Sequence, residues 1–218
     1  MSIYIRNIFE KIKIDHNWSF SDKSRKETTY LTHGYHRYPA KFIPQVVSKL
    51  LSMYAKKGDF IVDPFGGCGT TLVESKVNGM KSWGVDINPV AVMITKSKIT
   101  PIDPIDLEQS FIHLKDKINS YSDGMAVEMP KHERIDYWFK PLEKKKLSFI
   151  LNIINEVKDP VIRNFYYCAF SNSLKNCSIW LQKSNKPTRD LNKTPSDPLV
   201  YFLKQTKSMM KGNYEFNS

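Results

Sequence analysis

The sequence predicts an α/β fold whose parallel sheet is incomplete, followed by a helical segment. Two short apolar stretches, at 60–62 and 82–86, are each followed by a segment with helical spacing. This strand, helix, strand, helix order is typical of parallel winding. No third clear strand follows, and from about residue 106 the pattern favours helices alone.

The first hundred residues are expected to alternate between helices and strands. Pro44 and Pro89 suit first helical turns, because the missing N–H of proline costs little there, and Asn88 is a favourable N-cap. Gly79 can end a helix in the left-handed conformation. The expected elements are a helix over 44–55, a strand over 60–62, a helix over 70–79, a strand over 82–86 and a helix over 89–98.

The second half is expected to be helical, with a polar loop, QKSNKPTRDLNKTPSD, before a last helix that Asp197 caps. Two strands cannot bury both faces of a doubly wound sheet, so the fold is expected to be unfinished. The expected helices cover about 106–120, 141–157, 160–176 and 198–210. The aromatic residues of this half are expected in the core rather than at a site: Trp138, Phe139, Phe165, Tyr166, Tyr167 and Trp180.

Composition and charge indicate a globular protein with a polyanionic partner. A hydrophobic content of 41% is enough for an ordinary core, and 33 Lys+Arg against 22 Asp+Glu give a net charge of +11. Such a balance favours nucleic acid or an anionic membrane surface. The net charge is +7 in each of the segments 1–57 and 141–218, whereas it is −3 in the segment 58–140. We therefore expect a small ligand at the centre and a polyanion at the basic flanks.

The sequence also excludes several classes. No apolar run approaches the roughly 18 residues that span a bilayer, and the charged start does not resemble a signal peptide, so a cytoplasmic protein is expected. The three cysteines, Cys68, Cys168 and Cys177, lack any metal-binding spacing. Neither structural zinc nor a disulfide framework is expected.

A glycine-rich turn, DPFGGCGTT at 63–71, follows the first predicted strand. Glycines let a backbone turn through positive φ and let a ligand approach, and a strand-to-helix turn presents backbone N–H groups. The turn lacks the lysine of a phosphate loop, and Leu72 stands where the dinucleotide fingerprint needs its third glycine. Asp86 ends the second strand, where a carboxylate can accept ribose hydroxyls or only cap a turn. A nucleoside-type ligand remains.

DPFGGCGTT and GVDINP, preceded by HGYHRYPAKFIP, resemble the S-adenosylmethionine-dependent DNA methyltransferases that modify N6 of adenine or N4 of cytosine. The resemblance is strongest over residues 18–98. It implies a Rossmann-like methyltransferase fold, S-adenosylmethionine as cofactor, double-stranded DNA as partner and a restriction–modification system. The cofactor-binding residues that it implies are Tyr38, Pro39, Ala40, Lys41 and Phe42 from motif X, Asp63, Pro64, Phe65, Gly66, Gly67, Gly69 and Thr70 from motif I, and Asp86.

The catalytic tetrapeptide of that family, a polar residue followed by Pro-Pro and an aromatic residue, is missing, since no Pro-Pro occurs in the sequence. The catalytic residues are therefore unknown. We expect a cofactor-binding part at 1–100 and a helical part at 101–218 that contacts DNA or a partner. A complementary subunit or a missing C-terminal part would supply catalysis. The alternatives are an RNA guanine-N2 methyltransferase and a catalytically incompetent DNA-binding remnant. Residues 183–190 either contact DNA phosphates or form a solvated loop.

Overall fold

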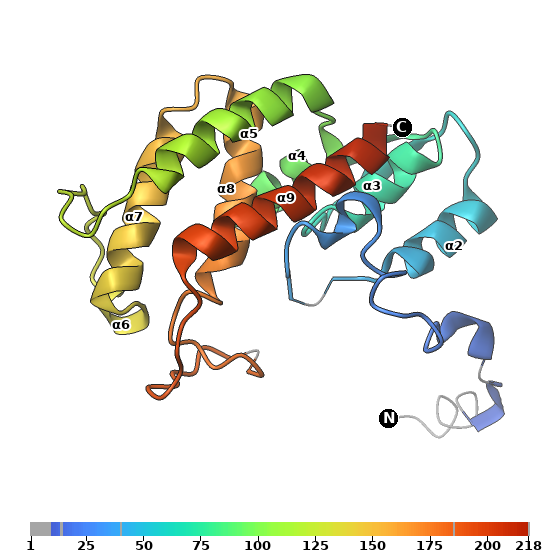
Figure 1. Ribbon diagram of the computed structural model, residues 1–218. Coiled ribbons are helices and arrows are strands. Elements are labelled where there is room, and N and C mark those ends of the chain that lie inside the picture. The colour runs from blue at the N-terminus through green and yellow to red at the C-terminus, as the bar shows by residue number, and fades with distance from the viewer. Residues whose placement is uncertain (1–9, 14, 40, 185, 218) are drawn as a thin grey trace.

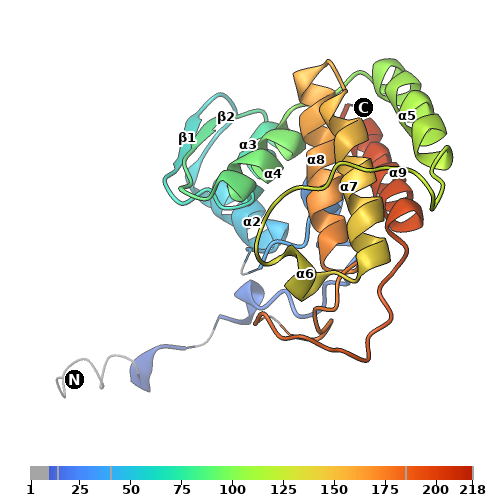
Figure 2. The same ribbon diagram turned by 90° about the vertical axis from the view of Figure 1, so that its left-hand side faces the viewer.

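The computed structural model describes residues 10–13, 15–39, 41–184 and 186–217. Its elements fall into two neighbouring groups (Figure 1). A small α/β group contains both strands with α2, α3 and α4, and a group of longer helices contains α5, α7, α8 and α9 beside it (Figure 2). This arrangement agrees with the predicted order of an α/β part followed by helices.

The α/β group is built around strands β1 (Phe60–Asp63) and β2 (Lys81–Gly84). They pair in parallel, with Phe60 opposite Lys81 and Asp63 opposite Gly84, which confirms the predicted parallel winding. The surrounding helices are α2 (Pro44–Tyr54), α3 (Thr70–Val77) and α4 (Pro89–Ile99). Asn88 caps α4 as predicted, because its Oδ1 accepts the Val90 amide at 3.0 Å.

The helical group contains α5 (Pro104–Asn119), α6 (Ile135–Trp138), α7 (Pro141–Asn155), α8 (Pro160–Leu174) and α9 (Pro198–Asn217). Asp197 caps α9, since its Oδ1 accepts the Leu199 amide at 2.9 Å. Helix α9 runs past the predicted end near 210. Its glycine, Gly212, packs so closely against Leu31 that a Cβ there would overlap the Leu31 carbonyl oxygen. The packing of α9 against η2 therefore requires glycine at position 212.

Helix α8 supplies the centre of the hydrophobic core. Phe165, Tyr166, Cys168 and Ala169 are fully buried, and α8 packs against α4, α7 and α9. Phe165 and Tyr166 therefore lie in the core as predicted. The prediction was wrong for Trp138, Phe139 and Trp180, which are only partly buried and lie outside the core cluster, whereas Tyr167 is partly buried and packs against it. Helix α6, which carries Trp138, was not predicted. One turn of helix is too short to produce a periodic pattern.

The 3-10 helix η2 (Leu31–Gly34) ties the two groups together, because it packs on α3, α4 and α9. Tyr35 follows it and is buried edge-on against Phe165, with ring centroids 5.6 Å apart. A second 3-10 helix, η1 (His16–Trp18), lies nearer the N-terminus. Residues 31–35, before α2, are thus part of the fold.

Within the described residues the sheet has two strands, which agrees with the absence of a third clear strand in the sequence pattern. Phe60 and Val62 of β1 and Trp83 of β2 are 62%, 52% and 53% exposed. Among described residues, no cluster suits a metal ion and no helix is long and apolar enough to cross a membrane. The cysteines are unpaired and buried.

Candidate cofactor-binding site

The glycine turn lies between the carboxyl end of β1 and the start of α3. Gly67 and Gly69 have φ angles of 49° and 78°, in the left-handed region that favours glycine. A Cβ at Gly69 would lie 2.8 Å from both the Cγ2 and Oγ1 atoms of Thr95 on α4. The turn therefore needs glycine at 69 for two separate reasons, its backbone conformation and its contact with α4.

Asp86 joins the glycine turn to the loop after β2. Its Oδ2 accepts the Gly67 amide at 2.9 Å, and its Oδ1 accepts the Asn88 amide at 2.8 Å. The side chain is partly exposed, so its remaining lone pairs are open to a ligand. The structure thus brings together the two features that the sequence placed 19 residues apart in the chain.

Most backbone N–H groups of the turn donate hydrogen bonds within the protein. This differs from the prediction that the turn presents its N–H groups to a ligand. Phe65 donates to Asp63 Oδ1 at 3.0 Å, Gly66 donates to the Val85 oxygen at 2.8 Å, and Gly69 donates to the Gly66 oxygen at 2.8 Å. These bonds fix a compact turn, because the pairing of β1 with β2 continues into it. A ligand here would contact the open backbone and the Asp86 carboxylate.

Among the described motif X residues, Tyr38 borders the turn. The Tyr38 ring is 3.8 Å from the position that a Cβ on Gly67 would take, and Lys41 donates to the His33 carbonyl at 2.9 Å. Pro39 is exposed next to them. Phe42 is 67% exposed. Ala40 lies outside the described residues.

The remaining predicted residues divide by burial. Asp63 holds the turn through the Phe65 amide, and Thr70 is buried at the start of α3. Pro64 is exposed and Phe65 is 88% exposed. The backbone of this segment forms the turn, whereas the Pro64 and Phe65 side chains meet no covering element among the described residues.

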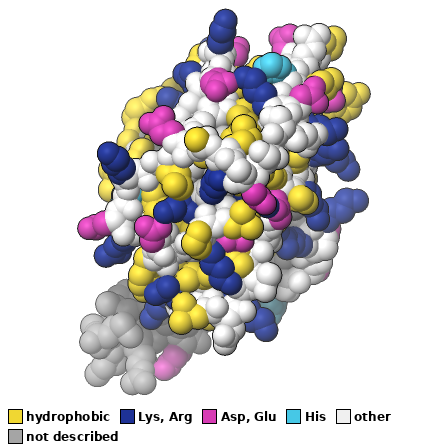
Figure 3. All heavy atoms as spheres, turned by 60° about the vertical axis from the view of Figure 1, so that its left-hand side comes forward, with side chains coloured by type: hydrophobic (Ala, Val, Ile, Leu, Met, Phe, Trp, Pro, Cys, Tyr) yellow, Lys and Arg dark blue, Asp and Glu magenta, His cyan; other side chains and the backbone are white. Residues whose placement is uncertain are grey.

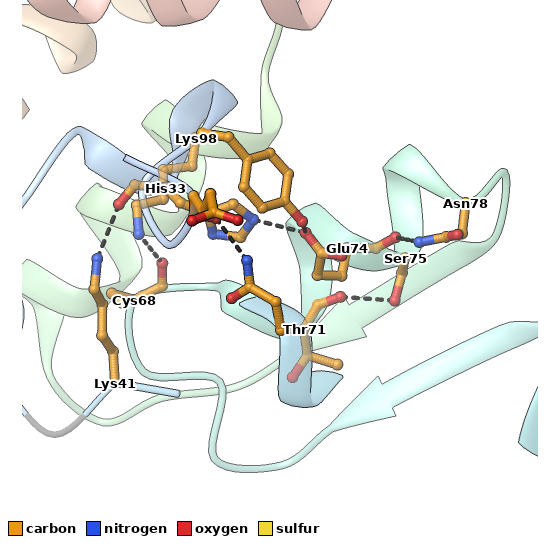
Figure 4. A network of polar contacts seen from close by, with 11 residues as sticks. His33, Lys41, Cys68, Thr71, Glu74, Ser75, Asn78 and Lys98 are labelled. Atoms are coloured by element: carbon orange, nitrogen blue, oxygen red, sulfur yellow. Dashed lines mark hydrogen bonds and ion pairs between the residues drawn. The ribbon is translucent and has the colours of Figure 1, made fainter. Parts of the chain in front are cut away.

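Polar side chains from α4 hold the turn on the side that faces this helix (Figure 4). Lys98 is fully buried and its Nζ donates to the Cys68 carbonyl at 2.9 Å. Thr95 donates to the Gly67 carbonyl at 3.0 Å. Both bonds hold carbonyls of the turn toward the protein. The role of Lys98 could not be predicted from the sequence, because a lysine near a helix end is usually solvated.

A buried carboxylate on α3 anchors the segment before motif X. Glu74 is 1% exposed and accepts hydrogen bonds from the Tyr30 hydroxyl and from His33 Nε2, the latter at 2.8 Å (Figure 4). Burial lowers the pKa of His33, so the ring is neutral at pH 7 and donates to the carboxylate. His33 is thus a structural residue here. The sequence signal that could have revealed this buried pair was Glu74 itself, a charged residue on the inner face of a predicted helix.

The sequence model of the DNA methylase family matches residues 6–97. This segment contains the glycine turn, Asp86, and the supporting residues of α3. The chain belongs to the DNA methylase family. No solved structure matches this DNA methylase chain.

Three curated relatives are Type II methyltransferases. M.MvaI of Kocuria varians is 35% identical over 175 residues, covering 76% of this chain and 38% of the relative. M.MjaII of Methanocaldococcus jannaschii is 37% identical over 143 residues, covering 62% and 27%, and M.BsoBI of Geobacillus stearothermophilus is 33% identical over 100 residues, covering 38% and 20%. The DNA methylase chain therefore spans well under half the length of these relatives. The match to M.MvaI is long enough to include part of the helical group.

Proposed function

We propose that this chain is the cofactor-binding part of a DNA methyltransferase that modifies N6 of adenine or N4 of cytosine in a restriction–modification system. The observation that carries the proposal is the glycine turn hydrogen-bonded to Asp86, inside the segment that matches the DNA methylase family. The relatives' names, which are all Type II methyltransferases, support it. They give no support to the alternative of an RNA guanine-N2 methyltransferase.

The described residues fit S-adenosylmethionine, which supplies an activated methyl group when bound. Gly67 leaves the backbone open, since no atom lies closer than 3.8 Å to the place of a Cβ. Asp86 can accept ribose hydroxyls on the lone pairs that the Gly67 and Asn88 amides do not use. Tyr38 borders the same turn and would line the amino-acid end of the cofactor. Lys98 and Thr95 keep the turn in place from α4.

Catalysis is proposed to require a complementary part that carries the family's Pro-Pro tetrapeptide, which this sequence lacks. The exposed apolar side chains of the two-stranded sheet support this, because Phe60, Val62 and Trp83 form a surface that a larger sheet would cover. We propose residues 1–100 as the cofactor-binding part. Residues 101–218 would contact DNA or that complementary part.

The DNA partner is supported by the charge distribution. Lys and Arg side chains are spread over the face shown in Figure 3, with hydrophobic side chains between them and fewer acidic ones. The chain has a net charge of +11, and Lys and Arg side chains that neutralise phosphates would release counterions from the duplex. Binding of duplex DNA should therefore weaken steeply between 50 and 200 mM salt, as roughly expected for several phosphate contacts. Salt-independent binding, or a clear preference for RNA, would contradict the DNA assignment.

The cofactor assignment is tested by calorimetry with S-adenosylmethionine on the purified chain, in complex with the complementary part if the chain alone is unstable. Asp86→Ala should weaken binding about tenfold or more, because charge-assisted hydrogen bonds contribute about 1.5–3 kcal/mol each. Asp86→Asn, which keeps an acceptor for the turn, should show most of the same loss. Asp116→Ala, an exposed change on α5, should bind like the wild type. Wild-type affinity for S-adenosylmethionine in both Asp86 variants would refute the assignment.

The requirement for a complementary part is tested by transfer of a labelled methyl group to unmethylated DNA. The chain alone should transfer none, and addition of a polypeptide with the missing tetrapeptide should restore sequence-specific transfer. Methylation by the chain alone would refute the requirement. No transfer in any combination, together with intact DNA binding, would favour the alternative of a catalytically incompetent DNA-binding protein.

A further inference from the structure

A groove runs along helix α9, on the side where the segment that contains η2 lies beside this helix (Figure 1). Two hollows form it. One of about 700 Å³ is lined by the segment 25–37 and α9, and one of about 510 Å³ lies nearer the start of α9. The two hollows share four lining residues: Arg37, Tyr201, Gln205 and Ser208. They are therefore one continuous surface, which we call the α9 groove.

One face of α9 forms a wall of the α9 groove. Its residues recur with helical spacing, which places them on the same side of the helix: Tyr201, Lys204, Gln205, Ser208, Lys211 and Glu215. Phe202, Thr206 and Asn213 lie on the opposite, buried face. At a rise of about 1.5 Å per residue, the groove face is about 21 Å long between Tyr201 and Glu215. A ligand that fills this groove is therefore long rather than compact.

The basic side chains of the α9 groove are mostly unpaired. Five of them line it: Arg25, Lys26, Arg37, Lys204 and Lys211. Except for Lys211, their side chains make no hydrogen bond or ion pair with any described residue. The carboxylates that line the groove are already engaged, because Glu27 accepts the Ser24 amide at 2.9 Å and Glu215 Oε1 lies 3.9 Å from Lys211 Nζ. Within the described part of the chain, the groove thus offers four unpaired cations to an anionic ligand.

Neutral hydrogen-bond donors lie between these cations. Asn172 of α8 is 7% exposed and its Oδ1 accepts the Arg37 amide at 3.0 Å, so its NH₂ group is left to donate to a ligand. The hydroxyls of Tyr201 and Ser208 have no hydrogen-bond partner among the residues that the structure describes. Amide and hydroxyl donors interspersed with Arg and Lys are the groups that bind phosphate oxygens along a nucleic acid.

The α9 groove suits the backbone of a duplex better than its bases. One strand of B-DNA has a phosphate for about every 3.4 Å of helix axis, so about 21 Å spans about six phosphates. No tryptophan or phenylalanine is found among the described residues that line the groove, whereas flat aromatic platforms are typical of sites that stack unpaired bases. Helix α9 lies outside the segment that matches the DNA methylase family, so this surface belongs largely to the helical group.

We propose that the α9 groove holds the phosphate backbone of one strand of duplex DNA, through Arg25, Arg37 and Lys204, without reading its sequence. The inference rests on the proposed DNA partner and assigns a contact surface to it. Phosphate contacts fix a protein on a duplex but carry no sequence information, so this surface supplies affinity and the choice of target site is made elsewhere. The helical group then holds the DNA while the α/β group holds the cofactor.

The first test measures the affinity of the full chain, without cofactor, for two labelled duplexes of unrelated sequence. Arg37→Gln and Lys204→Gln should each weaken both duplexes to the same degree and reduce the slope of log affinity against log salt by about one. Loss of one phosphate contact makes the fall in affinity from about 50 to about 200 mM salt about 3.5-fold smaller. Lys115→Gln removes the same charge from an exposed position of α5 and should leave the slope unchanged.

The second test locates the duplex directly and does not depend on a change of charge. The native cysteines are buried, so an introduced cysteine can be labelled selectively with a photoreactive group. The label on Ser208→Cys should crosslink to duplex DNA, whereas the label on Ser120→Cys, at the exposed end of α5, should not. Excess unlabelled duplex should suppress the crosslink, and a polyglutamate of equal charge should not.

Three results would overturn the proposal. The first is an unchanged salt slope in both groove variants. The second is a loss of affinity for only one of the two duplexes, which would show that the groove reads bases. The third is polyglutamate that suppresses the crosslink as well as duplex DNA does, which would indicate a surface for an acidic protein. Steep salt dependence that persists in both groove variants would refute the groove alone. A wild-type chain that binds no duplex would refute the proposed DNA partner as well.

Discussion

Substitution of Gly69 by alanine tests whether the glycine turn is held by both its conformation and its contact with α4. Three glycines of this chain separate the two effects. Gly69 has a φ of 78° and a Cβ there would lie 2.8 Å from Thr95. Gly58 has a φ of 92° with no atom within 4 Å of a Cβ, and Gly124 has neither the positive φ nor a neighbour. The three alanine variants therefore form a graded series.

The expected losses in the free energy of unfolding follow from these geometries. Gly124→Ala should change it by less than about 0.5 kcal/mol, as for other exposed sites. Gly58→Ala should lose about 1–2 kcal/mol, the cost of a left-handed conformation for a residue with a Cβ. Gly69→Ala adds about 1–3 kcal/mol of overpacking against Thr95, so its total should be about 2–5 kcal/mol.

Urea unfolding followed by helical circular dichroism measures these losses, provided that the slope with denaturant stays constant. The double variant Gly69→Ala with Thr95→Ala should lose less stability than the sum of its single changes, because the shorter side chain relieves part of the clash. Equal losses for Gly69→Ala and Gly58→Ala, or strict additivity in the double variant, would show that α4 does not constrain the turn.

Three further results are expected from urea unfolding. Glu74→Leu should lose about 2–5 kcal/mol, because the buried His33 and the partly buried Tyr30 hydroxyl lose their acceptor, whereas Glu74→Gln keeps an acceptor oxygen and should lose less. Burial, and then the charges of nearby lysines, lowers the pKa of His36 from 6.5 to about 4. As the pH falls, His36 therefore takes up a proton in the unfolded chain before it does so in the folded chain. Stability should drop by about 1–3 kcal/mol from pH 6.5 to 4, and a His36→Gln variant with an unchanged drop would contradict this cause. Gly212→Ala should lose about 1–3 kcal/mol, since a Cβ would meet the Leu31 carbonyl, and a neutral effect would show that α9 can shift.

The sequence by itself determined the local elements of the α/β group and the position of the glycine turn. Proline at first helical turns, Asn88 as a cap and the apolar stretch before the turn act over a few residues, and the structure places the corresponding elements within a few residues of the predicted ends. The turn itself was recognisable because positive φ restricts the sequence to glycine at Gly67 and Gly69. Local restrictions of this kind can be read without knowledge of the fold.

Only the tertiary structure decided which distant side chains meet. The burial of Glu74 against His33, 41 residues earlier, and the bond from Lys98 to Cys68, 30 residues earlier, follow from how α3 and α4 pack. The need for glycine at 212 likewise comes from the close packing of α9 against η2 and not from helix propensity. Trp138 and Trp180 meet because the chain returns from α8 to the end of α6. Such contacts depend on the relative placement of helices, which hydrophobic periodicity within one segment does not specify.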